Sequence, residues 1–142
     1  MRRRRQSLVL AGVFMLAAGF TAAGQTPVEQ PDSSSVPRMS QEEFKRLYAT
    51  GSILVVDVRN EIAFEAGRIP GAVHVALAST DRRAAQVLKL AKGRTIVTYC
   101  SCVGEHTSAE AGLILIRHGA RDVRALVGGF IEWARAGGKI ER

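Results

Sequence analysis

Cysteine is scarce in this sequence of 142 residues: it occurs only twice, at Cys100 and Cys102. Two cysteines exclude a small fold that is held together by several disulfides. The apolar run Leu8–Phe20 is also shorter than the roughly 20 residues that cross a bilayer comfortably. The sequence contains no internal repeat, and its length suits a single domain.

Residues 1–24 have the pattern of an export signal. Arg2–Arg5 form a basic cluster, the apolar run Leu8–Phe20 follows, and Thr21–Gly24 are small or nearly so. These three parts are typical of a secretory signal peptide. We therefore expect the protein to be periplasmic or secreted. An uncleaved leader that anchors the protein in the inner membrane is the alternative, and a membrane is a partner only in that case.

Charge does not indicate a nucleic-acid partner. The formal net charge is +7, from 20 basic and 13 acidic residues, but four of the basic residues are Arg2–Arg5 of the leader. Without the leader, which holds no acidic residue, the formal charge falls to +3. Such a mild balance gives no reason to expect nucleic-acid binding.

Residues 25–37 have the composition of a disordered linker. They include Pro27, Pro31, Pro37 and the serine triplet Ser33–Ser35, with almost nothing to bury. The folded domain is then expected over residues 38–142, which is long enough for one packed core.

The folded part alternates between strand and helix patterns. Ser40 followed three residues later by Glu43 is typical of a helix start, and Asn60 is placed to begin a short helix that Gly67 ends. Strands are expected at residues 53–58, 73–77, 95–100 and 123–127, and further helices at 81–92, 108–118 and after 129. This alternation predicts an α/β fold with a mostly parallel sheet.

The loop that follows residues 95–99 carries the functional hypothesis. Parallel sheets bind ligands at the carboxyl ends of their strands, and Cys100 lies at such an end. Gly104 allows the loop to curl, so that successive N–H groups can hold an anion beside the start of the next helix. We predict Cys100 as a nucleophile that is at least partly thiolate. The predicted anion cradle consists of Ser101, Val103, Gly104, Glu105, Thr107 and Ser108.

Four segments together resemble the rhodanese-like domain. They are "VVDVRNEIAFEAGRIPGAVHV", "IVTYC" with its glycine-containing loop, "SAEAGLILIRHG" and "VRALVGGFIEWARAG", and the resemblance covers about residues 38–140 in order. It implies a five-stranded, mostly parallel sheet flanked by helices on both faces. It also implies sulfur transfer through a persulfide on Cys100, from a sulfane-sulfur donor such as thiosulfate to a thiol or cyanide. No cofactor is expected.

The loop departs from the pattern of that family. It is about two residues longer, and a gap-free count back from Gly119 would make Cys102 the nucleophile; we prefer Cys100 because insertions fall in loops. The usual loop arginine is missing, and His106 is the only basic side chain. Histidine is only partly charged near neutral pH and lacks the fork of arginine. We therefore expect His106 to support donor binding only weakly.

Other functions stay open for the Cys100-x-Cys102 pair. Related phosphatases and arsenate reductases carry an arginine where His106 stands. Two thiolates and an imidazole could bind copper or zinc, but three ligands on one loop are too few for a closed site, and we expect no metal. The cysteines could also form a redox-active disulfide, in which Cys102 attacks a persulfide on Cys100. A non-catalytic module that binds a partner protein or a metal is the competing class.

Several residues near the predicted cleft have structural interpretations. Four charged residues there are expected mainly to support the fold: Asp57, Arg59, Glu65 and Arg68, the last standing where the family usually has histidine. The side chain of Glu105 is expected to be solvated. Phe130 and Trp133 are expected to anchor the core, while His74 and His118 have no predicted partner.

The export hypothesis predicts a shortened chain. Cleavage after the small residues should make the native protein begin near Gln25, outside the cytoplasm. N-terminal sequencing of the native protein checks this. A soluble cytoplasmic protein that still begins at Met1 would contradict it.

Overall fold

The computed structural model describes residues 32–142, so the predicted leader and the first part of the predicted linker lie outside the described residues. The elements are η1 (Ser33–Ser35), β1 (Arg38–Met39), α1 (Gln41–Ala49), β2 (Ile53–Asp57), α2 (Glu61–Ala66), β3 (Val73–His74), α3 (Leu77–Ala91), β4 (Thr95–Tyr99), η2 (Val103–Glu105), α4 (His106–Arg117), β5 (Val123–Leu126) and α5 (Gly129–Arg135).

All five strands form one parallel sheet in the order β1-β5-β4-β2-β3. The α/β fold with a five-stranded parallel sheet is therefore confirmed. β1 was not among the strands that residue patterns predicted, because its two residues, Arg38 and Met39, are too few to show a period. β3 is also shorter than the predicted strand at 73–77.

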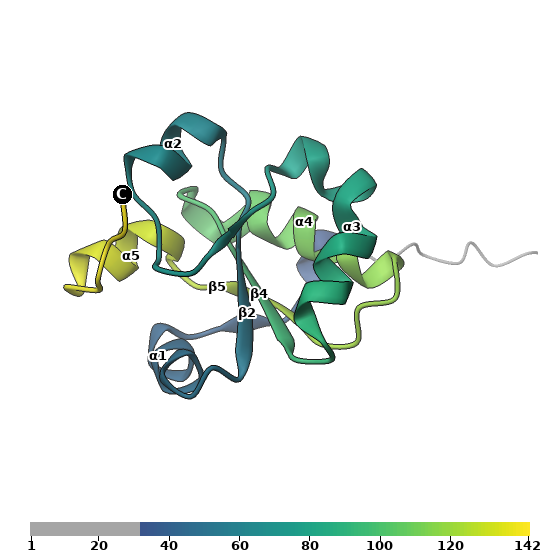
Figure 1. Cartoon of the computed structure of the whole chain (residues 1–142), viewed down its shortest axis with the longest axis horizontal. Coiled ribbons are helices and arrows are strands. Elements are labelled where there is room, and N and C mark those ends of the chain that lie inside the picture. Colours follow the sequence, from purple (N-terminus) through teal and green to yellow (C-terminus); the bar gives the residue numbers. More distant parts are fainter. Residues whose placement is uncertain (1–31) are drawn as a thin grey trace, which may run out of the picture.

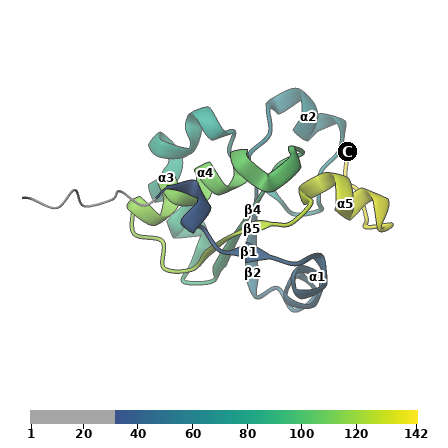
Figure 2. The same cartoon turned by 180° about the vertical axis from the view of Figure 1, so that it is seen from behind.

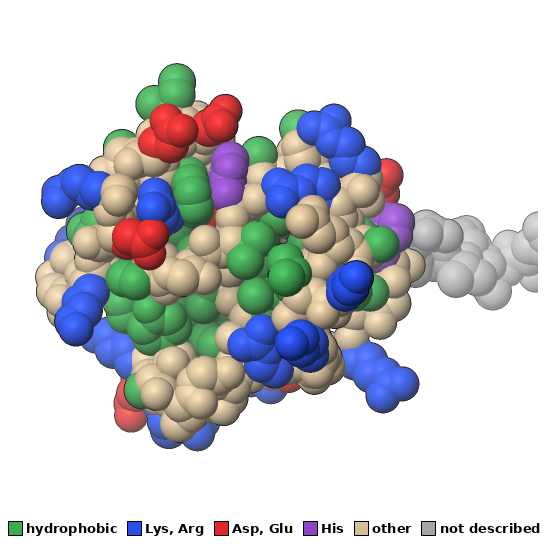
Figure 3. All heavy atoms as spheres, viewed as in Figure 1, with side chains coloured by type: hydrophobic (Ala, Val, Ile, Leu, Met, Phe, Trp, Pro, Cys, Tyr) green, Lys and Arg blue, Asp and Glu red, His purple; other side chains and the backbone are tan. Residues whose placement is uncertain are grey.

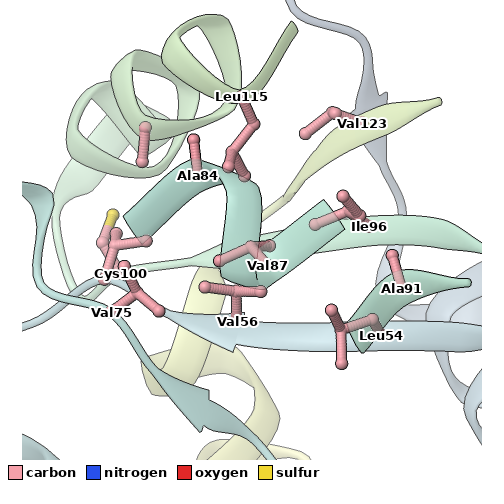
Figure 4. Packing of buried hydrophobic residues seen from close by; sticks show 12 residues of the cluster. Leu54, Val56, Val75, Ala84, Val87, Ala91, Ile96, Cys100, Leu115 and Val123 are labelled. Atoms are coloured by element: carbon pink, nitrogen blue, oxygen red, sulfur yellow. The ribbon is translucent and has the colours of Figure 1, made fainter. Parts of the chain in front are cut away.

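Helices cover both faces of the sheet, as Figures 1 and 2 show from opposite sides. On one face, α3 and α4 enclose a cluster that includes Leu54, Val56 and Ile96 (Figure 4). On the other face, Phe44 of α1 and Trp133 near α5's end pack on alternate strand residues such as Val55 and Val97. This alternation is the period of two that a strand imposes on its side chains. Both faces of β2 and β4 are therefore buried.

The predicted helix starts at residues 40 and 60 are confirmed. The Ser40 side chain accepts a hydrogen bond from the Glu43 amide at 3.1 Å, and the Asn60 side chain accepts one from the Ala63 amide at 2.8 Å. Each bond satisfies an N–H that the helix itself leaves without a partner. α3 starts at Leu77, earlier than predicted, and the Leu77 amide still bonds to the Val58 carbonyl at 3.2 Å.

The linker predicted over residues 25–37 is wrong for residues 32–37. Asp32 caps η1 through the amide of Ser34 at 2.8 Å. Val36 is 1% exposed and belongs to a buried cluster with α4 and β5, and the carbonyl of Pro37 accepts a hydrogen bond from the Ala125 amide at 2.9 Å. The buried Val36 side chain and the hydrogen bond to β5 hold this polar segment on the domain. Composition alone did not indicate either contact.

The surface carries charges of both signs. Figure 3 shows Lys and Arg side chains spread over several elements of one face, while acidic side chains gather near α2. Within residues 32–142, no helix combines the length and the apolar character that crossing a membrane requires.

The buried position of Val36 predicts a stability effect. Val36→Ala should lower the free energy of unfolding by about 1–3 kcal/mol, because it removes buried methyl groups and leaves a cavity. Val103→Ala removes the same atoms from a side chain that is 92% exposed, and it should change stability by less than about 0.5 kcal/mol. Urea unfolding of the two variants measures both values. An equally small effect of both would mean that residues 32–37 do behave as a linker.

Candidate active site

β4 delivers Cys100 to the carboxyl edge of the sheet, beside the start of α5. The Cys100 carbonyl accepts a hydrogen bond from the Phe130 amide at 2.9 Å. Gly129 has a φ of +49°, and a Cβ on it would collide with the Cys100 carbonyl oxygen. Only glycine therefore lets α5 start so close to the residue predicted as the nucleophile.

Cys100 and Cys102 form a disulfide, with their Cα atoms 5.7 Å apart. Cys100 is 3% exposed and lies at one end of the apolar cluster, near Val75 (Figure 4). The Cys102 amide nitrogen lies 3.4 Å from the Cys100 sulfur, and the Ser108 hydroxyl lies 3.7 Å from it. In the oxidised loop the Cys100 sulfur is not free to attack a donor, so nucleophilic chemistry requires the reduced form.

The loop after Cys100 curls at Gly104, as expected. Gly104 has a φ of 80° and Glu105 a φ of 56°, both in the left-handed region. α4 begins at His106, two residues before the predicted start, so Thr107 and Ser108 belong to its first turn. Of the predicted cradle residues, the structure places the Ser108 hydroxyl near the Cys100 sulfur. The amide that points at this sulfur belongs to Cys102, which was not among them.

The remaining loop side chains face solvent to different degrees. Ser101 and His106 are exposed, and Thr107 is half-buried. The His106 ring lies beside Gly104, because a Cβ on that glycine would come within 2.9 Å of His106 Nε2. Val103 is 92% exposed.

Glu105 is not solvated as expected, because its side chain fastens the loop to its surroundings. Glu105 Oε1 accepts a hydrogen bond from the Gly128 amide at 2.8 Å, and Oε2 lies 3.8 Å from Arg38 Nε. The side chain is only 14% exposed. The Glu105 carbonyl also accepts a hydrogen bond from the Ser108 hydroxyl at 3.0 Å. The carboxylate thus joins the loop to the β5–α5 junction.

A buried ionic cluster lies beneath the site. Asp57 is fully buried and accepts hydrogen bonds from Arg59 Nη2 and from the Tyr99 hydroxyl, both at 2.5 Å. The Arg59 guanidinium also donates to the Gly67 carbonyl at 2.7 Å and lies 4.1 Å from the centre of the Phe130 ring. This arrangement fits the structural pair expected of Asp57 and Arg59, since their polar atoms point into the fold.

The electrostatics of this cluster favour one charge state. Burial, and then the hydrogen bond to Asp57, raise the pKa of Tyr99 above its usual range. Burial alone would lower the pKa of Arg59, but its hydrogen bonds and its attraction to Asp57 raise it overall. The Tyr99 phenol therefore stays neutral and the Arg59 guanidinium stays charged at neutral pH.

Arg68 and Glu65 do not contact Cys100. Arg68 pairs with Glu141 at 2.6 Å, exchanges two backbone hydrogen bonds with it, and lies 4.6 Å from the centre of the Phe64 ring. Arg68 therefore holds the C-terminal segment on the domain. Glu65 is exposed on α2.

Both histidines without a predicted partner have one in the structure. His74 Nε2 lies 2.9 Å from the Arg59 carbonyl oxygen. His118 Nε2 lies 2.8 Å from Asp81 Oδ1, which links α4 to α3. Neither contact joins elements that are neighbours in sequence, so local patterns could not indicate it.

No metal centre is assembled within residues 32–142. In this part of the chain, no group of three or more His, Cys, Asp or Glu side chains is placed to hold a metal ion. The structure therefore adds no support to the copper or zinc interpretation of the loop.

Comparison with known proteins identifies the family. The model of the rhodanese-like domain matches residues 40–136. This match covers strands β2 to β5 and the loop between Cys100 and Ser108. The chain belongs to the rhodanese-like domain family.

Similar proteins show the range of that family. The chain is 33% identical over 102 residues to the HTH-type transcriptional regulator Rv0324 of Mycobacterium tuberculosis, covering 70% of this chain but only 42% of the regulator. It is 32% identical over 98 residues to a sulfurtransferase of Allochromatium vinosum, covering 69% of this chain and 87% of the relative. The rhodanese-like domain of the Anabaena sp. Alr3790 protein superposes with a TM-score of 0.64 at 27% identity, covering 74% of this chain and 78% of that domain.

The Glu105 contact predicts a local and a global effect. Glu105→Ala leaves the Gly128 amide without its acceptor, so it should lower the free energy of unfolding by about 1–3 kcal/mol and speed hydrogen exchange at Gly128. Glu110→Ala removes an exposed carboxylate from α4. It should change neither the free energy of unfolding nor the hydrogen exchange at Gly128. Exchange followed by NMR, together with urea unfolding, measures both. Unchanged exchange at Gly128 in Glu105→Ala would contradict the contact.

Proposed function

We propose that this protein is a sulfurtransferase that carries sulfane sulfur as a persulfide on Cys100. The observation that supports this most is the position of the Cys100 sulfur, at the carboxyl edge of the sheet with the Cys102 amide at 3.4 Å and the Ser108 hydroxyl at 3.7 Å. The Cys102 N–H at this place would stabilise negative charge on sulfur, while the Ser108 hydroxyl donates its proton to the Glu105 carbonyl. The sulfurtransferase of A. vinosum, which the chain matches over most of its length, supports the same class.

The proposed reaction has two halves. The reduced Cys100 thiolate attacks the outer sulfur of thiosulfate; the bond between the two thiosulfate sulfurs breaks, and sulfite leaves with its electron pair. The product is a Cys100 persulfide. A thiol or cyanide then attacks the outer sulfur, and the Cys100 thiolate leaves. No net oxidation of the protein occurs in this cycle.

The loop binds a dianionic donor less strongly than a loop with the usual arginine of the family would. His106 is exposed at the start of α4, and it replaces the arginine that would grip such a donor with two parallel bonds. We propose that His106 and the positive end of α4 bind the donor, and that turnover with thiosulfate is slow. We also propose that the protein acts outside the cytoplasm, on the basis of the leader.

Thiol–disulfide exchange is a second candidate function. The bond between Cys100 and Cys102 favours it, because a disulfide over so short a loop adds little stability by constraining the unfolded chain. A protein that only exchanged disulfides would form no persulfide with a sulfur donor, and this distinguishes it from a sulfurtransferase.

The proposed reaction predicts different results for the two cysteines. After reduction, Cys100→Ser should abolish thiosulfate-to-cyanide sulfur transfer, because no thiolate remains beside the Ser108 hydroxyl. Cys102→Ser should keep measurable transfer, since the nucleophile is intact. Steady-state assays of both variants, with wild type as reference, measure this. Activity in Cys100→Ser together with its loss in Cys102→Ser would make Cys102 the nucleophile.

A further inference from the structure

The two sulfurs of the disulfide differ in access and surroundings. Cys100 is buried, whereas Cys102 is partly exposed. Cys102 also lines a surface groove of about 360 Å³, and the groove runs from the loop, at Val103 and Glu105, to Ile131 and Arg135 at α5. In the oxidised loop a thiolate from solution can therefore approach Cys102, whereas Cys100 is buried.

We propose that Cys102 is a second catalytic residue that releases the sulfur carried by Cys100 as hydrogen sulfide. A dithiol then reduces the loop by attacking the Cys102 sulfur, with Cys100 as the leaving group. This inference rests on the proposed persulfide function and adds its product and its reductant.

The geometry needed for release is already present. The Cys102 sulfur is bonded to the Cys100 sulfur with the loop folded as described, so the Cys102 thiolate attacks the inner sulfur of a persulfide without a new loop conformation. The bond between the two persulfide sulfurs breaks, and the outer sulfur leaves as hydrogen sulfide after gaining a proton. The persulfide is reduced to sulfide, and the two cysteine thiols are oxidised to one disulfide.

Reduction of the disulfide has a preferred direction. A thiolate attacks along the sulfur–sulfur bond, and the thiolate that leaves fastest is the better stabilised one. The Cys102 amide points at the Cys100 sulfur at 3.4 Å, and Ser108, in the first turn of α4, lies 3.7 Å from the same sulfur. The incoming dithiol thus forms a mixed disulfide with Cys102, and its second thiol resolves that bond to restore both cysteines.

Release competes with transfer to an outside acceptor. A thiol held one residue away acts at an effective concentration of the order of millimolar or more, so sulfide release prevails when acceptor thiols are dilute. The reaction that supplies this protein must produce sulfane sulfur. The reactions that follow must consume sulfide and regenerate a dithiol.

Sulfide measurement tests the release step. Reduced wild-type protein is freed of reductant and given one equivalent of thiosulfate. It should then release sulfide and form the Cys100–Cys102 disulfide in equal amounts. Cys102→Ser should gain one sulfur by mass and release sulfide only after a thiol is added. If wild type also keeps its persulfide and releases no sulfide, the release step is wrong while the persulfide function stands. If Cys102→Ser gains no sulfur, the persulfide function itself fails.

Peptide mapping tests the direction of reduction. Oxidised protein is treated with glutathione, and free thiols are then blocked by an alkylating agent. Fragmentation spectra should place glutathione on Cys102 and the alkyl group on Cys100. The reverse assignment would overturn the proposed role of Cys100 as the leaving group.

Discussion

The site depends on the hydrogen bond from the Phe130 amide to the Cys100 carbonyl, and on the close approach of Gly129 that permits it. This contact joins the end of β4 to the start of α5. The Glu105 carboxylate strengthens the same junction through Gly128, and the Arg59 guanidinium packs on the Phe130 ring. A bulkier residue at 129 would separate the loop from the sheet edge and change the surroundings of both cysteines.

The chemistry follows from how this junction divides the two sulfurs. Cys100 is held within the core beside the Cys102 amide, which would stabilise a thiolate, whereas Cys102 is partly exposed to solvent. A buried nucleophile with an accessible neighbour suits a sequence of attack, release and reduction. The mixed-charge surface and the paired Asp57–Arg59 cluster have structural roles in this account.

The sequence predicted the α/β fold and the edge position of Cys100, because strand and helix patterns and capping residues such as Ser40 and Asn60 are local. It did not predict what depends on contacts between distant segments. Val36 looked like part of a linker because its partners lie in α4 and β5. Glu105 was predicted to be solvated because the amide that donates a hydrogen bond to its carboxylate, that of Gly128, lies far along the chain. The loop sequence left the disulfide open among several alternatives, and only the fold brings the sulfurs together with unequal exposure.

The central claim is that Cys100 carries sulfur covalently. The most direct test uses reduced Cys102→Ser protein and thiosulfate that is radiolabelled in its outer sulfur. The account predicts that label stays with the protein through gel filtration and is released by cyanide as thiocyanate. Protein that emerges without label, although its Cys100 thiol still reacts with an alkylating agent, would contradict it.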